Sequence, residues 1–270
     1  MNLQQFCEGI GLAAEAQELV YERGMTEQEY QAYKEHFYKD STAFLSRLKQ
    51  EEGYRQLLLY LFVRFAVDAH EAYRVRGIED AIYYDTFSDI QIWCLVCKQE
   101  HGEYGLEQFN WLKEHVQLRL FRLGRLQFQP YALDREVIVN GHNIEQNRIV
   151  LNVHIPAGEP LRPGNVEESF ERAASFFRGI APVFICQSWL LYPQIHQILN
   201  ADSNILHFQK QFEIYHVDEE SRQAEERIFG QISEDPHDYM GESYLQRSAK
   251  AYLIEGHKLG SGYGIRIASQ

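Results

Sequence analysis

The stretch 149–168 carries the residues with the clearest capacity for chemistry in this sequence. Its first half alternates apolar residues with Asn152 and His154, which predicts a strand with one buried face. Its second half contains glycines and prolines and then Asn165, followed three residues later by Glu168, a spacing that resembles a helix N-terminal capping box. A strand that leads through a glycine-containing loop to a helix N-terminus is a common place for a phosphate or another anion. The sequence therefore predicts an anion site between this strand and this helix.

His154 points away from Val153 and Ile155 in such a strand, so it faces either a groove or a covering helix. A histidine in this position is either a hydrogen-bonded structural residue or a site residue that exchanges a proton near neutral pH. The residues alone leave both interpretations open.

The elements that must position this stretch fall into two parts, for which we expect an α+β or α/β fold. Up to about residue 119 the apolar residues recur at helical spacing, most clearly over 54–76, which we expect to be the central helix of a bundle. From residue 120 the period changes to two, and strands near 120–130, 136–139 and 148–155 predict an antiparallel meander, with a tight turn at Asn140-Gly141. A helix over 166–178 and an apolar strand over 183–189 complete a βαβ unit, which makes the strands at 149–155 and 183–189 parallel. We therefore expect an N-terminal helical domain, residues 1–119, and a second domain, residues 120–270, with a mixed sheet flanked by helices and a last strand over 262–268.

The composition excludes several classes of function. The formal net charge of -13 leaves no basic excess to neutralise a nucleic acid, so no such partner is expected. The longest apolar run, Leu57–Val63, is too short to span a membrane, and the first residues do not resemble a secretory signal, so we expect a soluble, cytoplasmic protein. Cys94 and Cys97 lie in an apolar helical context and are expected to pack as small hydrophobic residues, and no metal site is predicted.

Several strings of the sequence stand out as a set: Trp93, Tyr104-Gly105-Leu106, Trp111-Leu112, Leu120-Phe121-Arg122-Leu123-Gly124-Arg125-Leu126-Gln127-Phe128, Val153-His154-Ile155-Pro156-Ala157-Gly158-Glu159-Pro160-Leu161 and Cys186-Gln187-Ser188-Trp189-Leu190-Leu191. Together they resemble a bacterial acyltransferase-like family. Its members join an N-terminal helical N-acyltransferase domain to a C-terminal domain similar to GCN5-related N-acetyltransferases, abbreviated GNAT. The order of the predicted elements agrees with this resemblance.

The resemblance implies a substrate site for acetyl-CoA or another acyl-CoA. In N-acetyltransferases the loop after the fourth strand wraps the pyrophosphate at a helix N-terminus, and the next strand splays away to admit the pantetheine arm. The corresponding residues here would be Gly158, Arg162, Gly164, Asn165 and Val166. Prolines at 156, 160 and 163 depart from the family pattern, because each removes an amide donor from the loop that should supply them.

Acyl transfer to an amine requires a base, a group that polarises the thioester carbonyl, and an acid for the departing thiolate. The resemblance implies His154 and Glu159 as candidate bases at the end of the fourth strand, and Tyr192, with Ser188 beside it, as the candidate acid after the splayed strand. The expected function is acyl-CoA-dependent N-acyl transfer, directly within a ternary complex, to a small-molecule acyl acceptor. The alternative is a non-catalytic ligand- or protein-binding protein on a degenerate GNAT-like scaffold. The helical domain would cover the acceptor side of the groove or mediate a homodimer.

Overall fold

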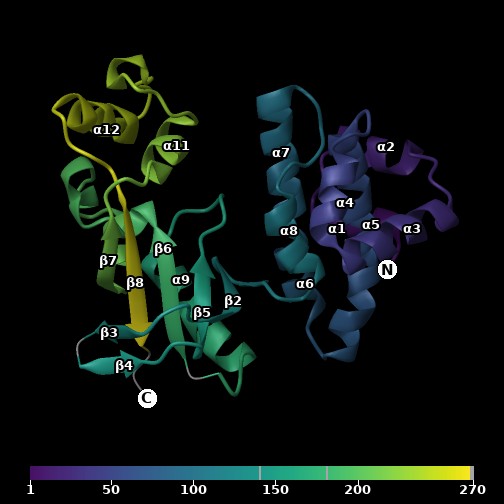
Figure 1. Ribbon diagram of the computed structural model, residues 1–270, viewed down its shortest axis with the longest axis horizontal. Helices are drawn as coiled ribbons and strands as arrows, with labels where there is room; N and C mark the ends of the chain where they lie inside the picture. Colours follow the sequence, from purple (N-terminus) through teal and green to yellow (C-terminus); the bar gives the residue numbers. More distant parts are fainter. Residues whose placement is uncertain (140, 181, 268–270) are drawn as a thin grey trace. The chain divides into compact units, whose positions relative to one another are not determined.

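The structure is a computed structural model that describes residues 1–139, 141–180 and 182–267 (Figure 1). The chain divides into two compact units, Met1–Leu123 and Gly124–Gln270. Asn140 of the expected Asn140-Gly141 turn and Ala268 at the end of the last expected strand lie outside the described residues.

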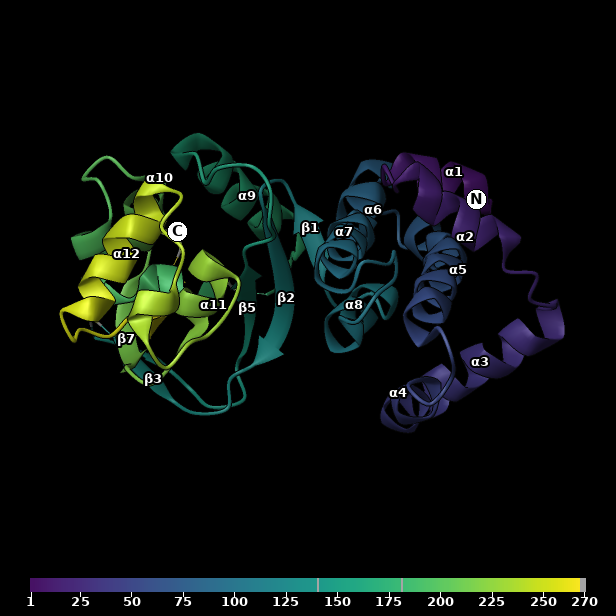
Figure 2. The same ribbon diagram turned by 90° about the horizontal axis from the view of Figure 1, so that it is seen from above.

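The first unit is a helical bundle built around one long helix, α5 (Tyr54–Val75), as its apolar spacing predicted. The buried side chains of α5 run from Leu57 to Tyr73, and α5 packs against α1, α2, α3, α6, α7 and α8 (Figure 2). Local sequence fixes the helix starts, since Thr26 and Asp40 accept backbone hydrogen bonds as N-caps of α3 and α4. The other elements of this unit are α1 (Leu3–Gly9), α2 (Ala14–Glu22), α3 (Glu27–Lys39), α4 (Ser41–Leu48), α6 (Asp80–Phe87), α7 (Asp89–His101), α8 (Phe109–Val116) and β1 (Phe121–Leu123).

The second unit is built on a mixed sheet whose strands run in the order β2-β5-β6-β8-β7. β2 is antiparallel to β5, β5 is parallel to β6, and β8 is antiparallel to both β6 and β7. The mixed sheet and its parallel pair were therefore predicted correctly. These strands are β2 (Leu126–Ala132), β5 (Ile149–His154), β6 (Val183–Ser188), β7 (Glu213–Asp218) and β8 (Ser261–Ile267).

One predicted strand does not belong to this sheet. β3 (Val137–Val139) pairs with β4 (His142–Ile144) in a separate two-stranded sheet, so β2 pairs directly with β5 and the predicted three-stranded meander is wrong. Val137 and Ile144 are buried in one hydrophobic cluster with Val150 and Ile185, and this packing holds the hairpin against the sheet. The alternation of residues shows that 137–139 is extended but carries no information on which strand it pairs with.

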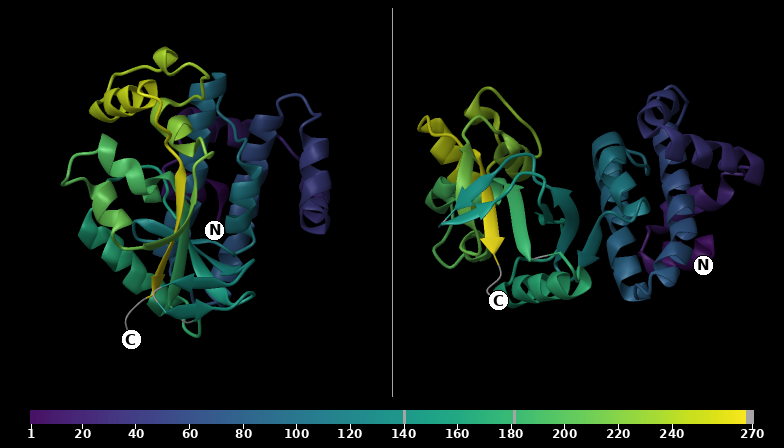
Figure 3. Two further views of the ribbon diagram at one scale, coloured as in Figure 1. Left: turned by 60° about the vertical axis from the view of Figure 1, so that its left-hand side comes forward. Right: turned by 60° about the horizontal axis from the view of Figure 1, so that its bottom comes forward.

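α9 (Pro163–Phe176) lies along one face of the sheet (Figure 3). Its Phe170 contacts Phe128 of β2 and Phe184 of β6, with ring centroids 5.9 Å and 4.8 Å apart. None of the helices in the described residues combines the length and the apolar character that crossing a bilayer requires. The remaining elements are the short helices η1 (Trp189–Leu191), η2 (Pro193–Ile198), α10 (Asn204–Gln209), α11 (Gln223–Phe229), η3 (Pro236–Asp238) and α12 (Tyr244–Ile254).

Candidate active site

The parallel strands β5 and β6 are paired over only part of their length. Their register joins Leu151 to Phe184 and Asn152 to Ile185, whereas β5 continues to His154 and β6 to Ser188. No pairing of β5 with β6 follows Asn152 in the described part of the chain, so the two strands separate toward their carboxyl ends. Backbone groups that face each other across such a separation are available to an extended ligand.

His154 lies at this open end of β5, on the face of the sheet opposite α9. Its partner in the register is Gln127 of β2, and Asn152 is paired with Gln129. Because directly opposed residues of an antiparallel pair point to the same face, these four polar side chains share one face. Phe128, which lies between the two glutamines, points to the other face and packs on α9.

The imidazole of His154 is half-buried and hydrogen-bonded to its neighbours on this face. Its Nε2 lies 3.2 Å from Oε1 of Gln129 and 3.3 Å from Nδ2 of Asn152. A protonated Nε2 donates to Gln129, whereas an unprotonated Nε2 accepts from Asn152. Imidazole is the side chain used most often as a general base.

The start of α9 differs from the prediction. α9 begins at Pro163 with Arg162 as the N-cap residue, and no side chain caps it. The predicted capping box of Asn165 and Glu168 is therefore wrong. Proline suits the first helical position because its φ is fixed and its missing N–H has no partner there, and this places Asn165 inside the first turn.

The first turn of α9 offers a different pair of free amides from the predicted pair of Asn165 and Val166. The N–H of Val166 donates to the carbonyl of Arg162 at 3.0 Å, so Val166 supplies no donor to an anion, contrary to the prediction. The N–H groups of Gly164 and Asn165 have no protein acceptor among the described residues. With the exposed guanidinium of Arg162, these two amides form a donor set that fits one phosphate group.

The loop before α9 is held in place by Arg125. Its backbone N–H donates to Oγ of Ser169 at 2.8 Å, and its Nε donates to the carbonyl of Glu159 at 2.6 Å. The preceding Gly124 has φ +80, and a Cβ at this position would lie 2.9 Å from Oγ of Ser169. A glycine is therefore needed for both the backbone conformation and the close approach to α9. Gly124 and Arg125 of the Leu120–Phe128 segment thus hold both α9 and the loop before it in place.

The remaining loop residues of the prediction are open to solvent. Gly158 is exposed with φ +119, and the side chain of Glu159 is exposed. Glu159 contacts Arg125 through its main-chain carbonyl, so its carboxylate is not committed to that contact. His154 is the better placed of the two predicted bases, because its side chain belongs to the ordered polar face of the sheet.

Ser188 and Tyr192 both have structural partners. Oγ of Ser188 accepts from the N–H of Leu190 at 3.2 Å and caps η1, and by alternation along β6 its side chain faces away from the polar face that carries His154. Tyr192 is 3% exposed and donates to Oε2 of Glu219 at 2.6 Å. Burial and then the Glu219 carboxylate raise the pKa of Tyr192 above its usual range. This arrangement does not favour either residue as the acid for a departing thiolate.

Gln127 is a candidate site residue that the sequence reasoning missed. Its side chain is 0% exposed, and among the described residues neither Oε1 nor Nε2 has a hydrogen-bond partner. The sequence feature that could have indicated Gln127 is its place in the segment Leu120–Phe128, which contributes to the family resemblance. A polar residue between two apolar ones also fits the solvent-facing side of any strand, so the alternation alone did not distinguish Gln127.

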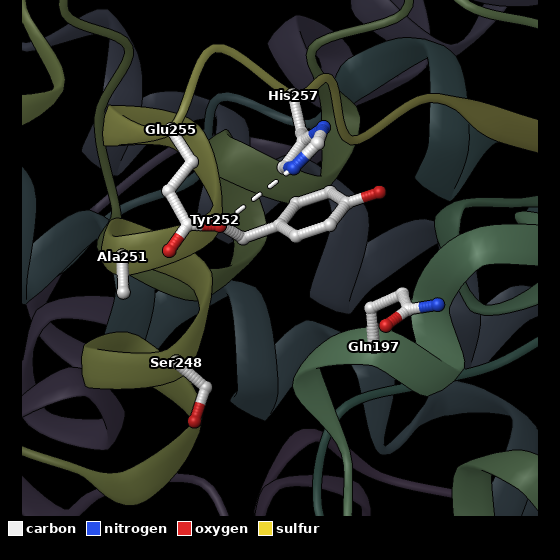
Figure 4. Close-up of a pocket in the computed structure, with 6 residues that line it drawn as sticks. All are labelled: Gln197, Ser248, Ala251, Tyr252, Glu255 and His257. Atoms are coloured by element: carbon white, nitrogen blue, oxygen red, sulfur yellow. Dashed lines mark ion pairs between the residues drawn. The ribbon is translucent and has the colours of Figure 1, made fainter.

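A separate hollow of about 460 Å³ lies beside α12. His257 stacks on Tyr252 there with ring centroids 4.4 Å apart, and its Nε2 is 3.7 Å from Oε2 of Glu255 (Figure 4). None of the predicted site residues lines this hollow, whose lining is Gln197, Ser248, Ala251, Tyr252, Glu255 and His257.

The cysteines lie in apolar surroundings. All four are free and buried, and burial raises the pKa of Cys94 to about 12 and that of Cys97 to about 11. Both thiols are therefore neutral near pH 7, which is consistent with a packing role. Among the described residues, the exposed Glu100 and His101 and the half-buried Glu107 have ligand atoms close enough to one another to hold a metal ion. Glu107 is already bonded to Tyr54 and Arg55, at 2.6 Å and 2.7 Å.

Comparison with known proteins identifies both halves of the chain. Residues 1–118 match the model of the N-acyltransferase N-terminal domain, and residues 120–266 match that of the GNAT-like C-terminal domain. No curated protein sequence matches the chain significantly.

Several solved structures share the fold. One is an acyltransferase in complex with decanoyl-CoA and teicoplanin, with a TM-score of 0.77. Others are an acyltransferase in complex with CoA and 10C-teicoplanin, with a TM-score of 0.78, and a mutant acyltransferase in complex with octanoyl-CoA, with a TM-score of 0.76. Each is 20% identical to this chain, and the alignments cover 98% of this chain and 87% of the other. As the resemblance predicted, the chain belongs to the family with a GNAT-like C-terminal domain, here preceded by an N-acyltransferase N-terminal domain.

Proposed function

We propose that this protein is an acyl-CoA-dependent N-acyltransferase that moves an acyl group directly from the thioester to an amine in a ternary complex. The observation that carries the proposal is the separation of β5 from β6 after Asn152, with His154 at the open end of β5. The proposal is supported by the family and by fold neighbours crystallised with decanoyl-CoA, octanoyl-CoA and CoA.

In this proposal the acyl-CoA lies with its pantetheine arm between β5 and β6. Its amide groups would pair with strand backbone groups that face the separation. The N–H groups of Gly164 and Asn165 and the side chain of Arg162 would hold one phosphate at the N-terminus of α9, where the helix dipole favours negative charge. Gly158 would let the loop backbone approach the cofactor, since it has no side chain and an exposed position.

His154 is the proposed base. It takes a proton from the amine as the nitrogen attacks the thioester carbonyl, the C–N bond forms, and the C–S bond then breaks. The departing group is a thiolate whose conjugate thiol has an ordinary pKa of about 8.5, so it leaves without a strong acid. This is why we assign no proton transfer to Tyr192, whose hydroxyl is bonded to Glu219.

We propose a small-molecule amine as the acyl acceptor. Two of the fold neighbours were crystallised with teicoplanin or 10C-teicoplanin, which is compatible with an acceptor of this class. The homodimer considered from the sequence is tested by light scattering of the purified protein.

The test is an assay of thiol release from acetyl-, octanoyl- and decanoyl-CoA with a panel of amines. We expect amine-dependent release by the wild-type chain and its loss in His154→Ala, with an unchanged circular dichroism spectrum. The exposed His142 on β4 provides a matched control, and His142→Ala should retain the wild-type rate. The proposal would be refuted if the chain neither bound the thioester nor released thiol at millimolar thioester.

A second candidate is a non-catalytic binding protein. It is favoured by Pro156, Pro160 and Pro163, each of which removes an amide donor from the predicted phosphate site. This candidate predicts acyl-CoA binding, or binding of another ligand, without amine-dependent thiol release. Steady turnover that depends on His154 excludes it.

A further inference from the structure

Gln127 is a polar side chain that the fold does not satisfy. Its carboxamide is fully buried, and both its donor nitrogen and its acceptor oxygen are without a partner in the described part of the chain. Buried polar groups in folded proteins are nearly always hydrogen-bonded, and leaving one unpaired costs folding free energy. An apolar residue at this position would avoid that cost. The presence of glutamine therefore calls for a partner other than the protein.

The position of Gln127 indicates where such a partner would be. Gln127 is directly opposite His154 in the β2–β5 register, and both side chains point to the face opposite α9. Side chains of directly opposed residues are close neighbours across a strand pair. His154 beside it is half-buried, so this end of the strand pair is partly open, and a ligand reaches the covered carboxamide once the side chains over it move.

The other polar residues of this face have hydrogen-bond partners within the protein. Oε1 of Gln129 lies 3.2 Å from Nε2 of His154, and Nδ2 of Asn152 lies 3.3 Å from the same nitrogen. These two amides orient the imidazole. Gln127 alone of the three carboxamides has neither polar atom engaged within the described residues.

We propose that the carboxamide of Gln127 binds the reacting atoms of acyl transfer. Its Oε1 accepts an N–H of the attacking amine, and its Nε2 donates to the carbonyl oxygen of the thioester. This inference rests on the proposed function and adds a substrate contact that the family match does not assign. It also commits the acceptor to a primary amine, because one N–H is given to His154 and a second is held by Gln127.

The step balances with no further reactant. The amine lone pair forms the C–N bond, and the carbonyl π electrons move to the oxygen, where Nε2–H of Gln127 stabilises the negative charge. One amine proton passes to His154 while Oε1 of Gln127 holds the other. The adduct then collapses: the C=O double bond re-forms, the C–S bond breaks, and the sulfur leaves with the electron pair as a thiolate. The thiolate takes a proton from solvent, and His154 releases its proton to solvent, which restores the base. A donor shielded from bulk water is most effective at the place where charge develops.

The test compares Gln127→Met, which keeps the approximate size and removes both polar atoms, with wild type and with His154→Ala in the thiol-release assay. We expect kcat to fall about 10²-fold, the loss typical of removing one donor to a developing oxyanion. The dissociation constant for octanoyl-CoA should change by less than about threefold, because the phosphate is held elsewhere. The unfolding midpoint in urea should stay the same or rise, since an apolar group replaces an unsatisfied one.

Gln127→Leu provides a second apolar variant if the methionine variant folds poorly. The exposed Gln231, for which the structure shows no hydrogen bond within the described residues, provides the control, and Gln231→Met should leave kcat unchanged. Wild-type kcat in folded Gln127→Met or Gln127→Leu, together with inactive His154→Ala, overturns the role of Gln127 and leaves the proposed function standing. Absence of turnover in the wild type overturns both.

Discussion

The two faces of the β2–β5 strand pair differ in what their side chains do. On the face toward α9, Phe128 packs with Phe170 and Phe184 in edge-to-face contacts. On the opposite face, the paired positions carry four polar residues, Gln127, Gln129, Asn152 and His154. The same two strands therefore contribute alternate residues to an apolar core and to a polar surface at the open end of β5.

This difference indicates how the fold separates stability from chemistry. The aromatic face gains free energy from burial and ring contacts. The polar face gains little, because its groups exchange hydrogen bonds with water for bonds with one another, and Gln127 has none in the described residues. Substitutions on the first face should change the free energy of unfolding, and substitutions on the second should change the rate of reaction.

The largest effect on stability is expected for Phe170→Ala. Phe170 is 2% exposed and contacts rings of β2 and β6, so its truncation should lower the free energy of unfolding by about 3–5 kcal/mol. Urea denaturation measures this loss. The exposed Ile138 serves as control, and Ile138→Ala should cost less than about 1 kcal/mol. A loss below about 1 kcal/mol for Phe170→Ala would show that the aromatic face does not carry the stability.

His154→Ala should show the opposite pattern. We expect kcat/KM to fall by about 10²–10⁴-fold, the usual contribution of a general base, while the free energy of unfolding changes by less than about 1.5 kcal/mol. Steady-state kinetics and urea denaturation of the same sample measure both quantities. If the variant loses several kcal/mol of stability and keeps its activity, His154 is a structural residue and the contrast between the faces fails.

Gly124→Ala tests the packing of the segment before β2 against α9, which bears on both stability and the loop before α9. It should destabilise the protein by about 1–3 kcal/mol, because alanine is strained at φ +80 and its Cβ would lie 2.9 Å from Oγ of Ser169. Binding of octanoyl-CoA should weaken as well, since the neighbouring Arg125 holds the loop before α9. Gly230→Ala is the matched control, because it has φ +74 and no atom within 4 Å of the added Cβ. Equal losses in both variants would mean that the contact with Ser169 contributes nothing.

Tyr192→Phe is expected to have the smallest effect. It removes one hydrogen bond to Glu219, for a loss of about 1 kcal/mol, and should leave kcat within about threefold of wild type. The raised pKa of Tyr192 adds a dependence on pH. Its contribution to stability is fully present below the pKa of an unfolded tyrosine, about 10, and is lost as the pH rises through the higher folded value. The variant should lack this alkaline loss. A fall in kcat of tenfold or more with stability intact would restore Tyr192 as the acid.

The sequence predicted the elements whose evidence is local. The spacing of apolar residues in 54–76 identified the central helix, and the alternation in 149–155 identified the strand that carries His154. The order of strand, helix and strand identified the parallel pair. Each of these patterns is a direct consequence of one element having one buried side.

The features that the sequence did not predict depend on partners far away in the chain. The pairing of β3 with β4 instead of with the main sheet depends on the packing of Val137 and Ile144. The bond from Tyr192 to Glu219 joins residues whose proximity no spacing indicates. The unsatisfied carboxamide of Gln127 appears only when every hydrogen bond around it is known. The start of α9 is different, since Pro163 was a local signal that outweighed the capping pattern of Asn165 and Glu168.

The most direct test of the central claim is a titration of the full-length, ¹⁵N-labelled chain with octanoyl-CoA, followed through assigned amide and imidazole resonances. We predict saturable shifts of the Gly164 and Asn165 amides, which the structure leaves free at the start of α9, and of the imidazole of His154 at the open end of β5. CoA alone should shift the two amides and perturb His154 less, because it lacks the thioester. Unchanged resonances of all three residues at millimolar octanoyl-CoA would contradict the claim that acyl transfer takes place between β5 and β6.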